Sequence, residues 1–152
     1  MDNVLLAVGL TFLLFGQTKG QHDPICGDAC LTLATNFNYY GCSATDDLYY
    51  ACRCVSPEFL GTIALCIDNN NCNREIWDWV DKVICQGYGE IVAPIPPFQT
   101  VLANATRFQG PPPTNATNPV SYPLIFPEDI FVVSYETSNA FTGNLTYGSF
   151  FG

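Results

Sequence analysis

The sequence predicts a small all-α, disulfide-rich head followed by an extended, proline-rich tail with little regular structure. All eight cysteines of the 152-residue chain fall between Cys26 and Cys85, and nine of the eleven prolines come after residue 90. The cysteine-bearing half also carries helix-start signals and apolar stripes at helical spacing. Proline removes a backbone donor and favours extended chain. We therefore expect four to five short helices in the head.

Three helix starts can be read along the head. Cys26 and Cys30 lie four residues apart within an apolar stretch, which suits a short helix that Gly41 ends. The run Thr45-Asp46-Asp47 is typical of a capped helix start. Ser56-Pro57-Glu58 is a stronger signal, with serine as the N-cap and proline in the first turn.

The last helix of the head follows Asn73, which can cap it. Trp77 and Trp79 are two residues apart, so they face different directions on a helix, and we expect Trp77 in the core and Trp79 at the surface. The predicted inward positions are Ile76, Trp77, Val80, Val83 and Ile84, and the predicted outward positions are Asp78, Asp81 and Lys82.

Eight cysteines within so short a stretch imply either four disulfides or a metal cluster. They are not arranged as paired C-x2-C hooks, and His22 is the only histidine, so a zinc ribbon is disfavoured. Helices this short bury too little apolar surface to fold unaided, and cross-links would offset that deficit. We expect disulfides at Cys26, Cys30, Cys42, Cys52, Cys54, Cys66, Cys72 and Cys85, with pairing that the sequence does not reveal.

Residues 1–20 have the features of a secretory signal peptide. Val4–Phe15 is apolar but shorter than the stretch of about 20 residues that spans a bilayer. Three Asn-x-Thr sequons predict glycosylation at Asn104, Asn115 and Asn144. Export explains both features and favours oxidised cysteines, since disulfides persist outside the cytosol.

The net charge of −9, with only five lysines and arginines, makes nucleic acid an unsuitable partner. A catalytic triad is also excluded, because the cysteines are expected to be bridged and His22 stands alone at the edge of the mature chain. We identify no catalytic residues and no metal-ligand cluster.

The tail is aromatic as well as proline-rich, which separates it from a disordered linker. Ile130–Tyr135 is the one segment in it that resembles a strand. We expect the tail to pack on the head or on a partner outside this chain.

The head resembles a known family. Pro24-Ile25-Cys26-Gly27-Asp28-Ala29-Cys30, then Cys42, Thr45-Asp46 and Cys52-Arg53-Cys54, resemble the fungal extracellular eight-cysteine module called CFEM. The last three cysteines depart from its spacing, because Cys66-x5-Cys72 is long for the family and Cys72-x12-Cys85 is short. The chain then divides into a signal peptide at 1–20, a CFEM-like helical domain at 21–89 and a glycosylated, juxtamembrane-like tail at 90–152.

A second resemblance covers nearly the whole mature chain. Tyr50-Ala51-Cys52-Arg53-Cys54, Glu58–Cys66, Leu102–Phe108 and Gly143–Gly148 are similar to the extracellular N-terminal region of fungal ferric-chelate reductases. This resemblance implies an ectodomain at the cell surface or a secreted protein, with a role in iron acquisition. Contact with a membrane would come only through a continuation beyond Gly152.

The chemistry of those reductases does not carry over to this chain. The family moves electrons from NADPH through FAD to haems held by histidine pairs in the membrane. The sequence contains neither a histidine pair nor a Gly-rich dinucleotide loop. We therefore expect no catalysis and no cofactor for this chain alone.

The CFEM resemblance implies a different role for Asp46. In haem-binding members an aspartate at this place ligates ferric haem iron, and a hard carboxylate oxygen suits Fe(III). Ferric chelates or haem are then the expected partners, and Tyr39, Tyr40, Tyr49 and Tyr50 could cover a porphyrin face. The alternatives are that Asp46 caps a helix and that the tyrosines pack in the core or on the surface. A secreted structural or interaction module is the third functional hypothesis.

Overall fold

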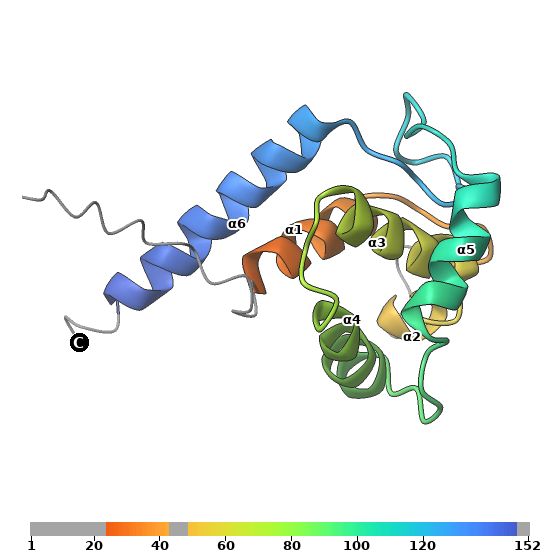
Figure 1. Cartoon of the computed structure of the whole chain (residues 1–152), viewed down its shortest axis with the longest axis horizontal. Coiled ribbons are helices and arrows are strands. Elements are labelled where there is room, and N and C mark those ends of the chain that lie inside the picture. The colour runs from red at the N-terminus through yellow and green to blue at the C-terminus, as the bar shows by residue number, and fades with distance from the viewer. Residues whose placement is uncertain (1–23, 43–48, 149–152) are drawn as a thin grey trace, which may run out of the picture.

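The computed structural model describes residues 24–42 and 49–148 (Figure 1). This part of the chain contains helices and two isolated β-bridges but no strand, so the predicted helical class is confirmed. The predicted signal peptide at 1–20 and the helix start at 45–47 lie outside the described residues. The elements are α1 (Pro24–Thr35), α2 (Tyr49–Arg53), α3 (Pro57–Asn69), α4 (Ile76–Trp79), the π-helix η1 (Val80–Tyr88), α5 (Phe98–Phe108) and α6 (Glu128–Gly148).

Helix α3 is the centre of the fold. It begins as predicted, with Ser56 as N-cap accepting a hydrogen bond from the Phe59 amide and with Pro57 in the first turn. Every residue from Phe59 to Ile67 is buried. A helix that is apolar around its whole circumference must be enclosed, and α1 and α5 both pack on it.

Four disulfides cross-link the head, as the sequence predicts, and the described residues include no free cysteine. Two of them staple α1 to α3 and to the turn after it, one closes the loop before α2, and one joins the end of α2 to η1. The pairs are Cys26–Cys72, Cys30–Cys66, Cys42–Cys52 and Cys54–Cys85. Each bond closes a loop of the unfolded chain, and such closures typically contribute about 2–4 kcal/mol each.

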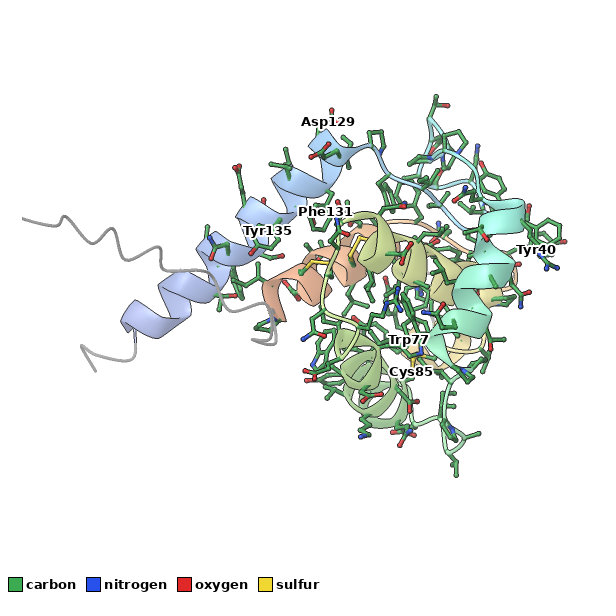
Figure 2. The ribbon with its side chains drawn as sticks, in the orientation of Figure 1. Tyr40, Trp77, Cys85, Asp129, Phe131 and Tyr135 are labelled. Carbon is green, nitrogen blue, oxygen red and sulfur yellow. A yellow bond between two sulfur atoms is a disulfide. The ribbon has the colours of Figure 1, made fainter. Side chains whose placement is uncertain are left out.

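Among the positions predicted to face inward in the last helix of the head, one departs from the pattern. Ile76, Trp77, Val80 and Ile84 are buried as expected, but Val83 is 40% exposed and Cys85 is buried instead. The cause is the π winding of η1, whose hydrogen bonds span five residues rather than four. This wider turn moves Val83 off the inner side. It brings the bridged Cys85 inward, on the same side as Trp77 (Figure 2).

Three side chains of this helix pack on or bond to other parts of the fold, and two of them are less exposed than predicted. Trp77 is in the core, and its indole N–H donates to the carbonyl of Pro96 at 3.1 Å. Trp79 is partly buried against the core rather than at the surface. Asp81, predicted to face outward, is partly buried and accepts a hydrogen bond from the Ile95 amide. These contacts attach the start of the tail to the head.

The tail packs on the head, one of the two expected outcomes, but it carries more helix than expected. Helix α5 lies against α3, where Gly61 leaves room for Ala105 and Pro123. The extended, proline-rich chain after α5 returns to the head at Val120, which exchanges backbone hydrogen bonds with Asn38 and Tyr40. The Leu124 amide donates to the buried Thr62 hydroxyl at 2.9 Å. Tail and head therefore share one core.

The strand predicted at Ile130–Tyr135 is wrong, because this segment belongs to helix α6. Although the segment is rich in β-branched residues, its buried positions follow helical spacing: Phe131, Ser134 and Ser138 are buried. Phe131 and Tyr135 lie four residues apart on the side that faces α1 (Figure 2), with ring centroids 5.9 Å apart. Proline is common at a helix start, where Pro127 lies. The acidic residues at 128–129 in the first turn complement the helix dipole.

Among the described residues, no helix has both the length and the hydropathy needed to cross a bilayer.

Candidate functional site

Three tyrosines form an aromatic surface where α2 meets the end of η1. The rings of Tyr49 and Tyr50 are 5.0 Å apart in an edge-to-face arrangement, and those of Tyr50 and Tyr88 are 6.2 Å apart. Tyr88 is 68% exposed, while Tyr49 and Tyr50 are half-buried. The Cys54–Cys85 disulfide joins α2 to η1 and so holds these rings in place. We call Tyr49, Tyr50 and Tyr88 the tyrosine cluster.

Of the four tyrosines proposed from the sequence to cover a ligand, Tyr39 is not available. It is fully buried, packs edge-to-face on Phe59, and donates a hydrogen bond to the Ala34 carbonyl. Burial raises the pKa of Tyr39 well above its ordinary value. Tyr40 is 76% exposed, and its ring points away from the core (Figure 2). Burial also raises the pKa of Tyr50, and the neighbouring Tyr49 adds to this effect.

Arg53 lies beneath the tyrosine cluster and was not identified from the sequence. Its guanidinium carbon is 3.5 Å from the centre of the Tyr49 ring, and the side chain is only 1% exposed. The terminal nitrogens donate to the carbonyls of Tyr49 and Phe37, but Nε has no partner within the described residues. The only ion pair between described residues is Arg74–Asp68. Arg53 therefore stacks on Tyr49 without a described carboxylate to neutralise it.

The Cys42–Cys52 disulfide closes a short loop whose last residues, from Tyr49, belong to α2. The Tyr49 hydroxyl donates to the Thr35 carbonyl at 2.8 Å and anchors this end of the loop to α1. Asp46 belongs to this loop, but residues 43–48 lie outside the described residues. The proposed roles of Asp46, as a ligand or as a cap, therefore stay predictions. The structure places the tyrosine cluster at the C-terminal end of the loop.

The predicted glycosylation sites occupy different environments. Asn104 is exposed on α5, and Asn115 is exposed in the loop that follows, where its side-chain oxygen accepts from both the amide and the hydroxyl of Thr117. Asn144 belongs to α6, and its side chain is not among those described. Glycosylation itself stays a prediction.

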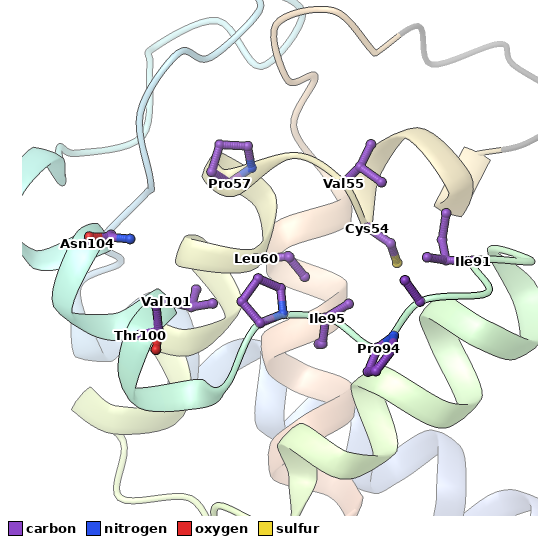
Figure 3. A pocket seen from close by; sticks show the side chains of 12 residues that line it. Cys54, Val55, Pro57, Leu60, Ile91, Pro94, Ile95, Thr100, Val101 and Asn104 are labelled. Carbon is purple, nitrogen blue, oxygen red and sulfur yellow. The ribbon is translucent and has the colours of Figure 1, made fainter.

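A groove of about 340 Å³ lies between the head and the tail (Figure 3). Leu60, Ile95 and Val101 form its buried apolar part, and the exposed Val55 stands at its rim. Asn104 is at the opposite end from Ile91. The sequence could not predict this groove, because its walls come from three segments that folding brings together.

The groove contains no group that could act as a nucleophile or as an acid–base pair. Its polar side chains are those of Thr100 and Asn104, and its one cysteine, Cys54, is bridged. The described residues contain no cluster of three or more metal-binding side chains. The arrangement is suited to binding.

Comparison with known proteins identifies the head. Residues 20–84 match the family model described as the CFEM domain. This segment is a CFEM domain. The match includes seven of the eight cysteines and ends one residue before Cys85. No curated protein and no solved structure matches the chain.

The CFEM domain and the four disulfides fit an extracellular or cell-surface protein. The off-pattern spacing of Cys66, Cys72 and Cys85 does not prevent pairing, since all three are bridged. The similarity to ferric-chelate reductases rests on the sequence resemblance alone. The tail, which lies outside the matched residues, supplies one wall of the groove.

Proposed function

We propose that this chain is an extracellular iron-acquisition module that takes up ferric haem beside the tyrosine cluster, with Asp46 as the iron ligand. The observation that carries the proposal is that the disulfide-closed loop of a CFEM domain, the loop that contains Asp46, ends at an exposed aromatic surface. CFEM domains bind haem or iron-related ligands. The haem is cargo here, and the proposal includes no catalysis by this chain.

The chemistry of each part suits that cargo. A porphyrin is flat and apolar on its faces, so it packs on aromatic rings such as the exposed ring of Tyr88. A carboxylate oxygen is a hard ligand and prefers Fe(III) to Fe(II). Reducing the bound iron should therefore weaken the complex and favour release.

Titration of the purified protein with ferric haem tests the proposal. We expect a Soret band at about 400 nm that saturates with added haem and is lost in Asp46→Ala. Asp47→Ala is the matched control, because it removes a neighbouring carboxylate, and it should leave the band unchanged. Tyr88→Ala should weaken binding without changing the fold, because the ring is exposed.

The absence of a saturable Soret band on titration would refute haem binding, and an Asp46→Ala variant that binds as tightly as wild type would refute Asp46 as the iron ligand. The first result would favour the third hypothesis, a secreted structural or interaction module.

We also propose, as a second candidate, that the chain is the ectodomain of a ferric reductase-like protein. The observation that favours it is that Leu102–Phe108, a part of the resemblance to those reductases, belongs to α5, which packs on the CFEM domain. The test is the genomic sequence after codon 152. An in-frame continuation into apolar helices with paired histidines would support this candidate, and an immediate stop codon would contradict it.

A further inference from the structure

We propose that the apolar groove between head and tail binds the N-glycan attached to Asn104. The sugar would cover the groove, so that the glycan is part of the folded surface. This inference requires export of the chain, but it does not depend on haem binding at the tyrosine cluster.

The position of Asn104 points to this occupant. Asn104 is both a lining residue of the groove and the acceptor of the sequon Asn104-Ala105-Thr106. Its side chain is exposed and lies at one end of the groove, directed toward Val101 and Leu60 (Figure 3). A sugar on the Asn104 amide nitrogen therefore starts at the groove, whereas a free ligand would have to be captured from solution at a cost in translational freedom.

The covalent chemistry is that of ordinary N-glycosylation. A lipid-linked oligosaccharide diphosphate donates the glycan, and a bond forms between Nδ2 of Asn104 and C1 of the first N-acetylglucosamine. The bond from C1 to the diphosphate breaks, and the proton released from Nδ2 balances the departing lipid diphosphate. No oxidant or reductant takes part.

The lining of the groove suits a sugar ring. A pyranose has C–H-rich faces that pack on aliphatic side chains, while its hydroxyl groups stay in water. Pro57, Pro94 and Val55 offer such side chains at the rim. Thr100 lies one helical turn before Asn104 on α5 and provides a hydroxyl near the first sugar. A volume of about 340 Å³ is at the lower end of the range of about 300–1,000 Å³ that is typical of small-molecule sites.

An uncovered groove would be unfavourable for an exported protein. Val55 is 65% exposed, and only 12% of the residues of the chain are charged. Exposed apolar surface of this kind promotes association. A glycan would bury the apolar walls and present hydroxyl groups outward.

The test compares apolar dye binding by glycosylated and unglycosylated forms of the exported protein. Thr106→Ala removes the sequon but leaves the Asn104 side chain in place. The exposed Thr106 hydroxyl donates to the Ala103 carbonyl within its own helix, so its loss should not disturb the fold. We expect Thr106→Ala to bind anilinonaphthalene sulfonate with a gain in fluorescence and a blue shift. Thr117→Ala is the matched control, because it removes the glycan from Asn115, which is not part of the groove, and should bind no more dye than wild type.

Enzymatic trimming provides a second measurement on protein that is already folded. An endoglycosidase that leaves one N-acetylglucosamine should leave dye binding low, and an amidase that removes the whole glycan should raise it. The inference is overturned if glycopeptide mapping finds Asn104 unmodified, if Thr106→Ala and wild type bind the dye equally, or if native mass spectrometry finds a separate apolar molecule in the glycosylated protein. None of these results bears on the Soret band, so the two proposals fail separately.

Discussion

At the scale of single residues, Arg53 carries a charge although its side chain is only 1% exposed. It is stabilised by stacking on Tyr49 at 3.5 Å and by two carbonyl hydrogen bonds. A planar guanidinium can do both at once, whereas a lysine ammonium has neither the flat face nor the forked donors. The residue sits between Cys52 and Cys54, so the backbone around it is fixed by two disulfides.

We predict that Arg53→Lys lowers the free energy of unfolding by about 2 kcal/mol, the value of a desolvated cation–π contact. Chemical denaturation with the disulfides intact measures this change. Arg74→Lys is the matched control, because Arg74 is 64% exposed and its guanidinium is 5.5 Å from the Phe98 ring. Equal denaturation midpoints for Arg53→Lys and wild type would show that the stacking is energetically unimportant.

Tyr39 makes the fold sensitive to alkaline pH. Burial raises its pKa above the ordinary value of 10.0, so the folded protein keeps this proton where the unfolded chain loses it. The contribution to stability is complete below pH 10 and falls as pH rises further, by up to about 1.4 kcal/mol per pH unit.

We predict that the free energy of unfolding declines above pH 10 and that the decline is shallower in Tyr39→Phe. At neutral pH the variant should lose about 1 kcal/mol, since it lacks the hydrogen bond to the Ala34 carbonyl. Denaturant titrations at a series of pH values provide the measurement. Parallel pH profiles for the two proteins would mean that Tyr39 does not cause the alkaline loss.

At the scale of elements, the contact of α3 with α5 attaches the tail to the head. A Cβ at Gly61 would lie 2.8 Å from Cγ of Pro123 and 3.1 Å from Cβ of Ala105, so only glycine permits this approach. The tail thereby covers the outer side of α3, whose residues from Phe59 to Ile67 are all buried.

We predict that Gly61→Ala destabilises the protein by about 1–3 kcal/mol, the usual cost of overpacking. Hydrogen exchange should report faster exchange in α5 and in the segment around Leu124. Gly87→Ala is the control, because its Cβ would meet only the Lys82 carbonyl at 3.5 Å, an ordinary contact. If Gly61→Ala is as stable as the control, the tail is not closely packed on α3.

Elements with local signals could be predicted from the sequence, and those set by long-range contacts could not. Ser56 as N-cap and Pro57 in the first turn mark the start of α3 in the sequence. The π winding of η1 has no comparable local signal, and it exchanges Val83 for Cys85 on the buried side. The β-branched residues at the start of α6 favour a strand locally, but packing of Phe131 and Ser134 on α1 selects a helix.

In the candidate site, too, neighbours in sequence could be predicted and groups brought together by folding could not. Tyr49 and Tyr50 could be predicted as an aromatic pair because they are adjacent, but Tyr88 joins them only through folding. The groove joins α3, the segment after η1 and α5, so no single stretch of sequence contains it. The burial of Arg53 could not be predicted either, because arginine is rarely buried and nothing in the sequence marks this one as an exception.

At the scale of the whole molecule, head and tail share one core that four disulfides cross-link on the head side. The cysteine count and the export signals predict oxidation, but eight cysteines allow 105 pairings. The structure selects one pairing, in which α1 is stapled twice and the loop before α2 is closed on itself.

Disulfide mapping of the exported protein tests the central claim, that this is an extracellular domain held by four specific cross-links. We predict that the intact protein is eight hydrogens lighter than its reduced form, and that digestion without reductant yields the linked peptides Cys26–Cys72, Cys30–Cys66, Cys42–Cys52 and Cys54–Cys85. Free thiols in properly exported protein, or a peptide that joins Cys26 to Cys30, would contradict the account.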